Sequence, residues 1–226
     1  MPEQGFESDR IRTSDGDLEI TFLGHGSLLF TFGGKRIYVD PFSRVADYEA
    51  LPKADLVLIT HEHRDHLDPE ALALIRTPAT AIVGPERCAE KVPGCIVLRN
   101  GEVAVVQGLR IEAVPAYNLV HKRETGEPFH LRGAGNGYMI TFGEVRVLVA
   151  GDTENTPELK ALRGVDVAFL PMNLPYTMTP EMVTDLARAI RPRVLYPYHY
   201  GSTDPRRLVE LLADVPEVEV RIRSLA

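Results

Sequence analysis

Residues 60–68 read Thr60-His61-Glu62-His63-Arg64-Asp65-His66-Leu67-Asp68, and this stretch holds three of the 7 histidines in the chain. It directly follows the apolar run 56–59, which predicts a short buried strand. Neutral imidazole and carboxylate oxygen are ligands that zinc and similar divalent ions prefer. Four such groups within six positions at a strand end predict a metal site rather than an ordinary polar loop.

The spacing inside this stretch indicates how the ligands are presented. His61 and His63 are two residues apart, so in an extended segment they face the same side. Asp65 and His66 follow in a turn before a helix that should begin at Pro69. The helical zinc motif His-Glu-x-x-His would require a histidine at position 65, where this chain has aspartate. The ligands are therefore expected on a loop.

Two further predicted strands end in residues that can bind a metal. One is followed by Gly151-Asp152-Thr153, and the other ends at His199. Taken alone, Asp152 could be a turn or helix cap and His199 a packed core histidine. Three strand ends that all offer ligands favour one composite site, because loops at one sheet edge carry the chemistry in such folds.

The pattern of elements predicts a layered α+β sandwich. Residues 18–39 read as a three-stranded meander with turns at Gly24-His25-Gly26 and Gly33-Gly34. Two sets of antiparallel strands with helices late in each half fit a sandwich of this class. No domain boundary is evident, so residues 1–226 are expected to form a single domain. Further strands are expected at 56–59, 81–83, 96–98, 103–106, 109–114, 138–142, 145–149, 167–170, 194–196 and 218–222, and helices at 69–76, 156–162, 180–190 and 204–212.

Composition narrows the class of protein. Hydrophobic residues make up 44% and charged residues 25% of the 226 residues, as in ordinary globular proteins. The net charge of -7 argues against nucleic acid as the main partner. The polar residues 1–12 lack the apolar core of a signal peptide, and no apolar run approaches the roughly 20 residues that span a bilayer. We therefore expect a cytoplasmic protein without a membrane partner.

The motifs resemble those of a known family. His61-Glu62-His63-Arg64-Asp65-His66, Gly151-Asp152-Thr153 and His199-Tyr200-Gly201 occur in the order typical of metallo-β-lactamase-fold hydrolases. Further segments resemble the branch that includes L-ascorbate phosphate lactonases and uncharacterised zinc-dependent hydrolases, namely Leu23-Gly24-His25-Gly26, Val39-Asp40-Pro41-Phe42 and Val114-Pro115-Ala116-Tyr117-Asn118. The resemblance runs from about Leu18 to the C-terminus. It implies a four-layer αββα sandwich and a metal-dependent hydrolase.

The resemblance also implies a ligand set. His61 and His63 would bind one metal and Asp65 and His66 a second, with His199 completing the second site. Asp152 would bridge the two ions. The implied metal is zinc, as one or two ions, with manganese or iron as alternatives. Asp65 would in addition act in catalysis by orienting the attacking hydroxide and carrying a proton to the leaving group.

One expected ligand is missing from its usual place. The family carries a third histidine for the first metal just after the strand that ends at 114–117, and this chain has Asn118 there. An amide oxygen is a poorer ligand than imidazole. His121 and His130 lie in the following loop, and His130 is favoured because it is closer to the glycine-rich return at 133–137. A weak site at Asn118 and a single-metal protein remain open alternatives.

Other polar residues are expected around the metals. Asp40 could accept a proton from a ligand imidazole, and His25 could support a ligand or face the substrate, although ordinary turn roles remain open for both. Lys122, Arg123 and Arg132 form a basic patch that could bind a carboxylate or phosphate, or could be a solvated run of charges.

The function expected from these residues is metal-assisted hydrolysis. A metal-bound hydroxide would attack a small, anionic, ester- or lactone-like substrate. The alternatives are a phosphodiesterase or nuclease on the same fold and a non-catalytic metal-binding module. The expected partner is a small-molecule substrate, and the sequence is also compatible with a homo-oligomer.

Overall fold

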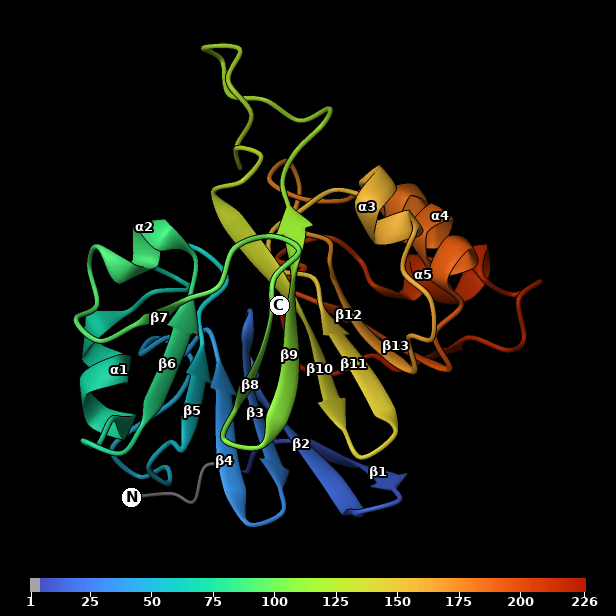
Figure 1. The fold of residues 1–226 in the computed structure, drawn as a ribbon. Coiled ribbons are helices and arrows are strands. Elements are labelled where there is room, and N and C mark those ends of the chain that lie inside the picture. Colours follow the sequence, from blue (N-terminus) through green and yellow to red (C-terminus); the bar gives the residue numbers. More distant parts are fainter. Residues whose placement is uncertain (1–4) are drawn as a thin grey trace.

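Two seven-stranded sheets form the centre of the molecule in the computed structural model, which describes residues 5–226 (Figure 1). Helices α1 (Pro69–Ile75) and α2 (Glu86–Ala89) lie beside the first sheet. Helices α3 (Pro157–Lys160), α4 (Pro180–Ile190) and α5 (Arg206–Leu211) lie beside the second. The layer order confirms the predicted αββα sandwich.

Each sheet has an antiparallel half and a parallel half. The first sheet keeps chain order: β1 (Ser8–Thr13), β2 (Gly16–Gly24), β3 (Ser27–Phe32), β4 (Lys35–Val39), β5 (Leu56–Leu58), β6 (Ala81–Gly84) and β7 (Ile96–Val97). The second contains β8 (Val103–Val106), β9 (Leu109–Ala116), β10 (Gly135–Phe142), β11 (Val145–Val149), β12 (Val167–Pro171), β13 (Val194–Tyr198) and β14 (Glu219–Val220).

The expectation of two antiparallel strand sets was wrong for the later half of each sheet. Strands β4 to β7 pair in parallel, and so do β11 to β14. Helical connections such as α1 and α4 return the chain to the starting edge of the sheet, which makes the next strand parallel. Two elements carry no clear sequence signal and were not expected: β1, a mostly polar edge strand, and α2, a single helical turn.

The predicted helix starts are confirmed for α1 and α4. The Asp68 carboxylate accepts the backbone N–H of Glu70, and the Thr179 hydroxyl accepts that of Met182. A proline occupies the first turn of both helices, where its missing N–H costs nothing. Within residues 5–226, no helix is long and apolar enough to cross a membrane.

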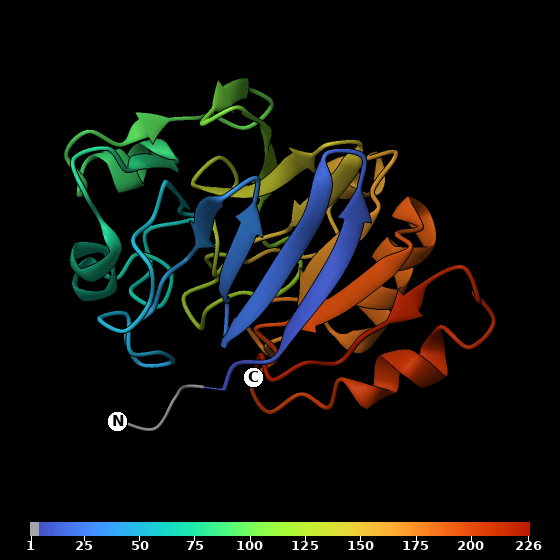
Figure 2. The same ribbon diagram turned by 90° about the horizontal axis from the view of Figure 1, so that it is seen from below.

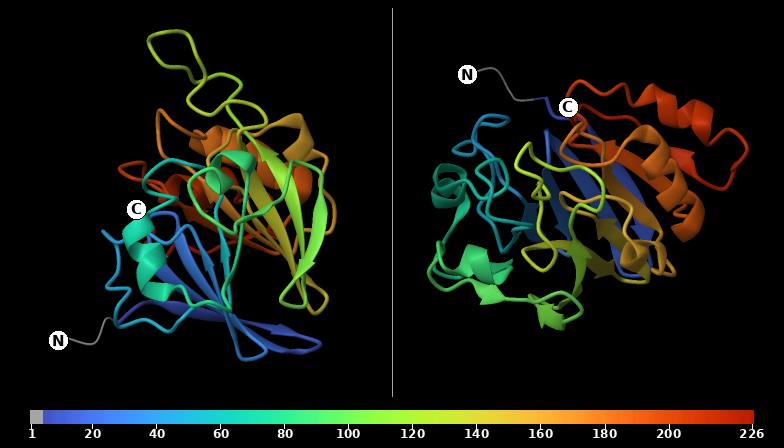
Figure 3. Two further views of the ribbon diagram at one scale, coloured as in Figure 1. Left: turned by 60° about the vertical axis from the view of Figure 1, so that its left-hand side comes forward. Right: turned by 90° about the horizontal axis from the view of Figure 1, so that it is seen from above.

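Aromatic side chains pack between the two sheets. Phe22 of the first sheet lies 5.2 Å from Tyr196 of the second, measured between ring centroids, and the Phe169 ring stacks on Tyr196 at 4.8 Å. Figure 2, seen from below, places the N-terminal strands close to the C-terminal segment. These contacts between the sheets position the loops of both sheets beside one another at a common edge. The loop between β9 and β10 stands out from that edge (Figure 3).

Candidate metal centre

One cluster consists of three histidines. His61 and His63 follow β5, and His130 comes from the loop between β9 and β10. One ring nitrogen from each lies within 4.8 Å of the others. His61 Nε2 and His63 Nδ1 are 3.0 Å apart. This arrangement brings together residues that are 69 positions apart in the sequence.

A second cluster adjoins the first. His66 Nε2 and His199 Nε2 are 3.2 Å apart, and Asp65 Oδ2 lies 3.5 Å from His199 Nε2. His66 lies in the turn after β5, while His199 follows β13 in the other sheet. The three-residue group His61-His66-Asp152 shares His61 with the first cluster. His66 Nε2 also lies 3.6 Å from Asp65 Oδ2, so the ligand atoms of the two clusters form one continuous set.

Asp152 lies between the two clusters. Its Oδ2 atom is 3.3 Å from His130 Nε2 and 3.6 Å from His66 Nε2. Its other oxygen, Oδ1, is buried and accepts no hydrogen bond from the described part of the chain. A buried carboxylate oxygen normally has a partner, so this position fits a ligand to a cation. Asp152 is placed where a bridging ligand would have to be.

The spacing of these atoms fits a metal centre. Zinc–nitrogen bonds of about 2.0–2.1 Å at tetrahedral angles place ligand atoms about 3.3 Å apart. The separations of 3.0 Å for His61–His63, 3.2 Å for His66–His199 and 3.3 Å for His130–Asp152 are close to that value. Because Asp152 lies between the two clusters, its carboxylate is within reach of a metal held by either one.

The protonation states also suit ligands. Burial lowers the pKa values of His61 and His63 below that of free histidine, which leaves their ring nitrogens free to donate an electron pair. Burial raises the pKa of Asp152, but the neighbouring His199 and His66 rings outweigh it and keep that pKa well below its ordinary value. His61 and His63 are therefore neutral, and Asp152 is ionised. Burial lowers the pKa of His66, but the charges of Asp152 and Asp40 outweigh it and keep that pKa well above the ordinary value, so a cation bound at this ring would displace a proton.

Asp40 holds one of the ligand rings. Its carboxylate is fully buried and lies 2.8 Å from His66 Nδ1, and it also accepts the backbone N–H and the hydroxyl of Thr60. This contact keeps a proton on Nδ1 of His66, so Nε2, which lies 3.6 Å from Asp152 Oδ2, is the ring nitrogen that could bind a metal. Asp40 has φ +44°, an uncommon left-handed conformation for a residue other than glycine.

His25 reaches the second cluster from the turn between β2 and β3. Its Nε2 atom is 3.0 Å from Asp65 Oδ2, and its ring lies 3.8 Å from the His199 ring between centroids. Gly26 beside it leaves room for the ligand rings, because a Cβ there would lie 3.3 Å from both His66 and His199. His25 thus supports Asp65 and could itself reach a metal.

The structure places Asn118, His121 and His130 differently from one another. The Asn118 side chain contacts His130 rather than the metal cluster, with Oδ1 2.7 Å from His130 Nδ1. His121 Nδ1 lies 2.7 Å from Glu154 and belongs to neither cluster. His130, favoured from the sequence, is the residue whose ring joins His61 and His63.

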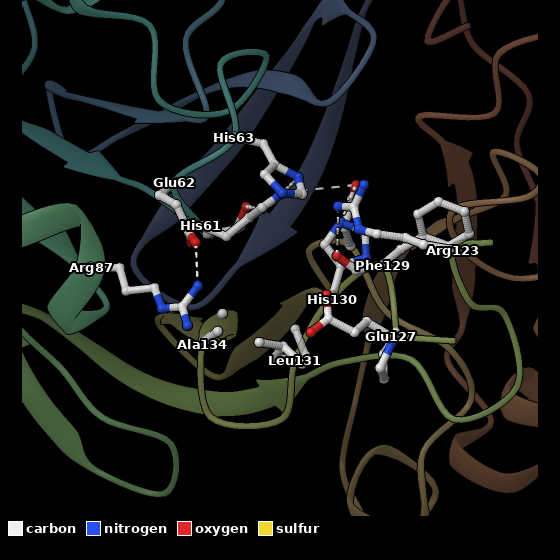
Figure 4. Close-up of a pocket in the computed structure, with 15 residues that line it drawn as sticks. His61, Glu62, His63, Arg87, Arg123, Glu127, Phe129, His130, Leu131 and Ala134 are labelled. Carbon is white, nitrogen blue, oxygen red and sulfur yellow. Dashed lines mark hydrogen bonds and ion pairs between the residues drawn. The ribbon is translucent and has the colours of Figure 1, made fainter. Parts of the chain in front are cut away.

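Two adjoining cavities open onto the clusters. One of about 130 Å³ is lined by His61, His63, Arg87 and Ala134 among others, and Figure 4 shows Arg123 and Phe129 across it from Arg87. The second, of about 370 Å³, is lined by His63, Asp65, Arg123, Phe129, His130, Asp152, Asn173, Tyr176 and His199. Substrate entering either cavity would meet ligand residues.

The three basic residues expected near the site do not gather there. Arg123 lines both cavities. Arg132 pairs with Glu158 at 2.6 Å and lies over the Tyr117 ring, and Lys122 is exposed and lines neither cavity. The order of residues along a loop cannot show which side chains turn inward, so the sequence grouped all three.

Several residues at the centre were not singled out from the sequence. Thr60 connects Asp40 to the His61 ring, Glu154 anchors the long loop, and Phe129 and Tyr176 line the larger cavity. Thr60 and Glu154 lie next to recognised motifs, which is a weak signal. Phe129 and Tyr176 carry no motif and become neighbours only in the folded chain.

Comparison with known proteins agrees with this geometry. Residues 19–199 match the family model described as "Beta-lactamase superfamily domain". A UPF0173 metal-dependent hydrolase of Thermococcus onnurineus is 32% identical over 220 residues, covering 89% of this chain and 95% of that protein.

Comparison with solved structures also finds metal-dependent hydrolases. A candidate metal-dependent hydrolase from Parabacteroides distasonis is 46% identical, with a TM-score of 0.93 over 98% of this chain and 100% of that one. Igni18, a metallo hydrolase from Ignicoccus hospitalis, is 26% identical, with a TM-score of 0.74 over 91% of this chain and 94% of that one. This chain belongs to the metallo-β-lactamase superfamily and is a metal-dependent hydrolase.

Proposed function

We propose that the protein hydrolyses a small anionic substrate of the ester or lactone class, with zinc ions held by the two clusters. The observation that carries this proposal is the position of the Asp152 carboxylate, which lies between the two clusters. Both clusters line a cavity that Arg123 also lines. The first ion would be held by His61, His63 and His130. The second would be held by Asp65, His66 and His199.

Metal ions held by these residues would supply two effects: they would lower the pKa of a bound water towards about 7 and would polarise the substrate oxygen under attack. Asp65 supplies the acid–base chemistry in this proposal. Its side chain is 36% exposed, so it faces the cavity, whereas Asp152 is only 5% exposed. Burial raises the pKa of Asp65, but hydrogen bonds with His199 and His25 outweigh it and hold the pKa well below its ordinary value, so the carboxylate is ionised. In the proposed reaction it would receive the proton of the attacking water only as that bond breaks. It would return that proton to the leaving group.

Arg123 is the residue expected to bind the anionic part of the substrate. Its guanidinium lies over the Phe129 ring and donates to the Phe129 carbonyl oxygen at 3.3 Å. Within residues 5–226 it has no carboxylate partner, so its charge is available. Arg87 differs because Glu62 pairs with it at 2.7 Å. One free guanidinium in an acidic chain suits a small anion better than a nucleic acid.

The test is a panel of lactones, thioesters, phosphodiesters and β-lactams, each assayed with zinc, manganese and iron. Asp152→Ala is the matched control, because it removes the shared ligand. We expect turnover of anionic lactones or esters by the zinc-loaded protein and none by the variant. Turnover of phosphodiesters alone would replace this substrate class with the phosphodiesterase alternative. Equal turnover by metal-free Asp152→Ala protein would contradict metal-assisted hydrolysis.

A further inference from the structure

Glu154 is a buried carboxylate that the hydrolytic chemistry does not use. It is fully buried and lies two residues after Asp152. Its Oε2 atom accepts the backbone N–H groups of Leu119 and Val120 at 2.6 and 2.7 Å, and Oε1 accepts that of His121 at 2.7 Å. Burying a charge is costly unless hydrogen bonds compensate for it. The three hydrogen bonds from backbone N–H groups offset this cost. They also fix the start of the loop between β9 and β10.

Asn118 connects this carboxylate to His130. Its amide Nδ2 donates to Glu154 Oε1 at 3.1 Å and to the Tyr176 carbonyl oxygen at 2.9 Å. Its Oδ1 accepts the backbone N–H of His130 at 2.9 Å and faces His130 Nδ1 at 2.7 Å. All four hydrogen-bonding positions of the amide are occupied. Asn118 is therefore not free to be the missing metal ligand itself.

The consequence for His130 is a fixed tautomer. Because Asn118 Oδ1 is only an acceptor, the proton of the His130 ring must lie on Nδ1. Nε2 is then left with its lone pair, and it is the atom 3.3 Å from Asp152 Oδ2. A ligand histidine commonly has its second nitrogen held in this way by a carboxylate or a carbonyl oxygen. Here the side-chain amide of Asn118 takes that role.

We propose that Glu154 and Asn118 are positioning residues that hold His130 as the third ligand of the first metal. This inference rests on the metal-binding part of the proposed function and does not depend on the substrate. The asparagine at the position where the family usually carries a histidine is then not a lost ligand. It supports a histidine placed twelve residues later, on the loop that also carries Phe129 and Arg123.

This arrangement couples the first metal to the substrate cavity. His130 is preceded by Phe129, whose ring stacks edge-on against Tyr176 at 5.0 Å, and Phe129 lies under Arg123. The loop is fixed at one end by Glu154 and at the other by His130. Metal bound by His130 would tether residues 119–129 at both ends. The wall that holds the substrate would therefore be ordered by the metal.

The test measures metal binding without any substrate. Metal content and affinity are determined by competition with a chelator for the wild type, Asn118→Leu, His130→Ala and the double variant. We expect Asn118→Leu to weaken one of the two sites by about 10–100-fold, as for other residues that orient a metal ligand, and to leave the other unchanged. The double variant should bind no more weakly than His130→Ala, because Asn118 acts through His130.

Two further variants separate positioning from folding. Asn118→Asp keeps an acceptor for His130 Nδ1 and should retain most of the affinity that Asn118→Leu loses. His121→Gln removes a different contact of Glu154 and should leave both affinities unchanged. Hydrogen exchange of residues 119–129 should slow on adding zinc in the wild type and stay fast in Asn118→Leu.

Several results would overturn the inference. They are additive losses in the double variant, a loss of both sites in Asn118→Leu, and affinity within twofold of the wild type in that variant. Failure of every substrate in the hydrolysis panel would leave these binding results intact. The two proposals can therefore fail separately.

Discussion

At the scale of single residues, the centre depends on groups that set which nitrogen of each histidine is free. Asp40 accepts a hydrogen bond from Nδ1 of His66, and the amide oxygen of Asn118 accepts one from Nδ1 of His130. Both supporting residues are buried, so their hydrogen bonds are shielded from water. A short sequence motif identifies the ligands, but the supporting groups determine which ring nitrogen carries the proton and which can bind the metal.

Asp40→Asn is expected to weaken metal binding at the second site by about 10–100-fold, because the amide no longer offers two charged acceptors to Thr60 and His66. The measurement is zinc affinity by chelator competition. Asp68→Asn is the matched control, since Asp68 is another buried aspartate of the same region that caps α1 and contacts Ser43 instead of a ligand. The control should lose stability but keep zinc affinity.

Arg123→Ala is expected to raise KM for anionic substrates by about 10-fold or more with little change in kcat, because a hydrogen bond to a charged group contributes about 1.5–3 kcal/mol. Steady-state kinetics on an anionic substrate and its neutral analogue would measure this change. Arg132→Ala is the control, because Arg132 lies on the same loop as Arg123 but its guanidinium already pairs with Glu158 of α3. Equal effects of the two variants would contradict a role for Arg123 in binding the anion.

At the scale of elements, the site is assembled where strands of the two sheets end beside one another. Thr60 follows β5 of the first sheet, and Gly151 follows β11 of the second. Gly151 has φ +67°, and a Cβ atom there would lie 2.7 Å from the Asn136 carbonyl oxygen and 3.2 Å from Thr60. The glycine thus lets the backbone bring Asp152 against the histidine loop.

Gly151→Ala is expected to destabilise the protein by about 1–3 kcal/mol through overpacking, with about 1 kcal/mol more from the left-handed backbone. Asp152 would be displaced, so both metal sites should weaken. Urea denaturation and zinc content would measure the two effects. Gly33→Ala is the control, because Gly33 also has a positive φ of +55° but faces open space. The Gly33→Ala variant should be destabilised only by the strain of the left-handed backbone, and its zinc content should be unchanged.

At the scale of the whole molecule, the site requires the two sheets to stay in register. The first strand and the C-terminal segment contribute to this through Asp9, whose carboxylate accepts hydrogen bonds from Tyr196 and Arg223. Burial raises the pKa of Asp9, but these hydrogen bonds and the charges of Arg223 and Arg221 outweigh it, so the pKa lies below its usual value of 3.8.

Asp9→Asn is expected to lower the free energy of unfolding by roughly 1–3 kcal/mol at pH 7. A carboxylate with a lowered pKa in the folded state stabilises that state above pH 3.8, and this contribution is lost as the pH falls through its folded-state pKa. The difference between wild type and variant should therefore shrink between pH 5 and pH 3. Urea midpoints across this range would measure it.

A matched control for this pH dependence is Asp214→Asn, which removes an exposed pair with Arg188. Exposed pairs contribute little because water and salt screen them. The control should show little difference from the wild type at any of these pH values. A constant difference for Asp9→Asn down to pH 3 would contradict the assigned role of its charge.

The sequence by itself determined the sandwich and most of the candidate ligands. His61, His63, Asp65 and His66 are recognisable because their spacing is local, and Asp152 and His199 because each follows an apolar strand. It did not determine the parallel halves of the sheets, because periodicity does not encode strand direction. The tertiary structure alone decided which loop residues turn inward. His130 was favoured from the sequence only by its proximity to a glycine-rich return, and its place beside His61 depends on Asn118 and Glu154. Asn118 and Glu154 follow different strands of the second sheet, and His61 follows a strand of the first, so only the folded chain brings these residues together.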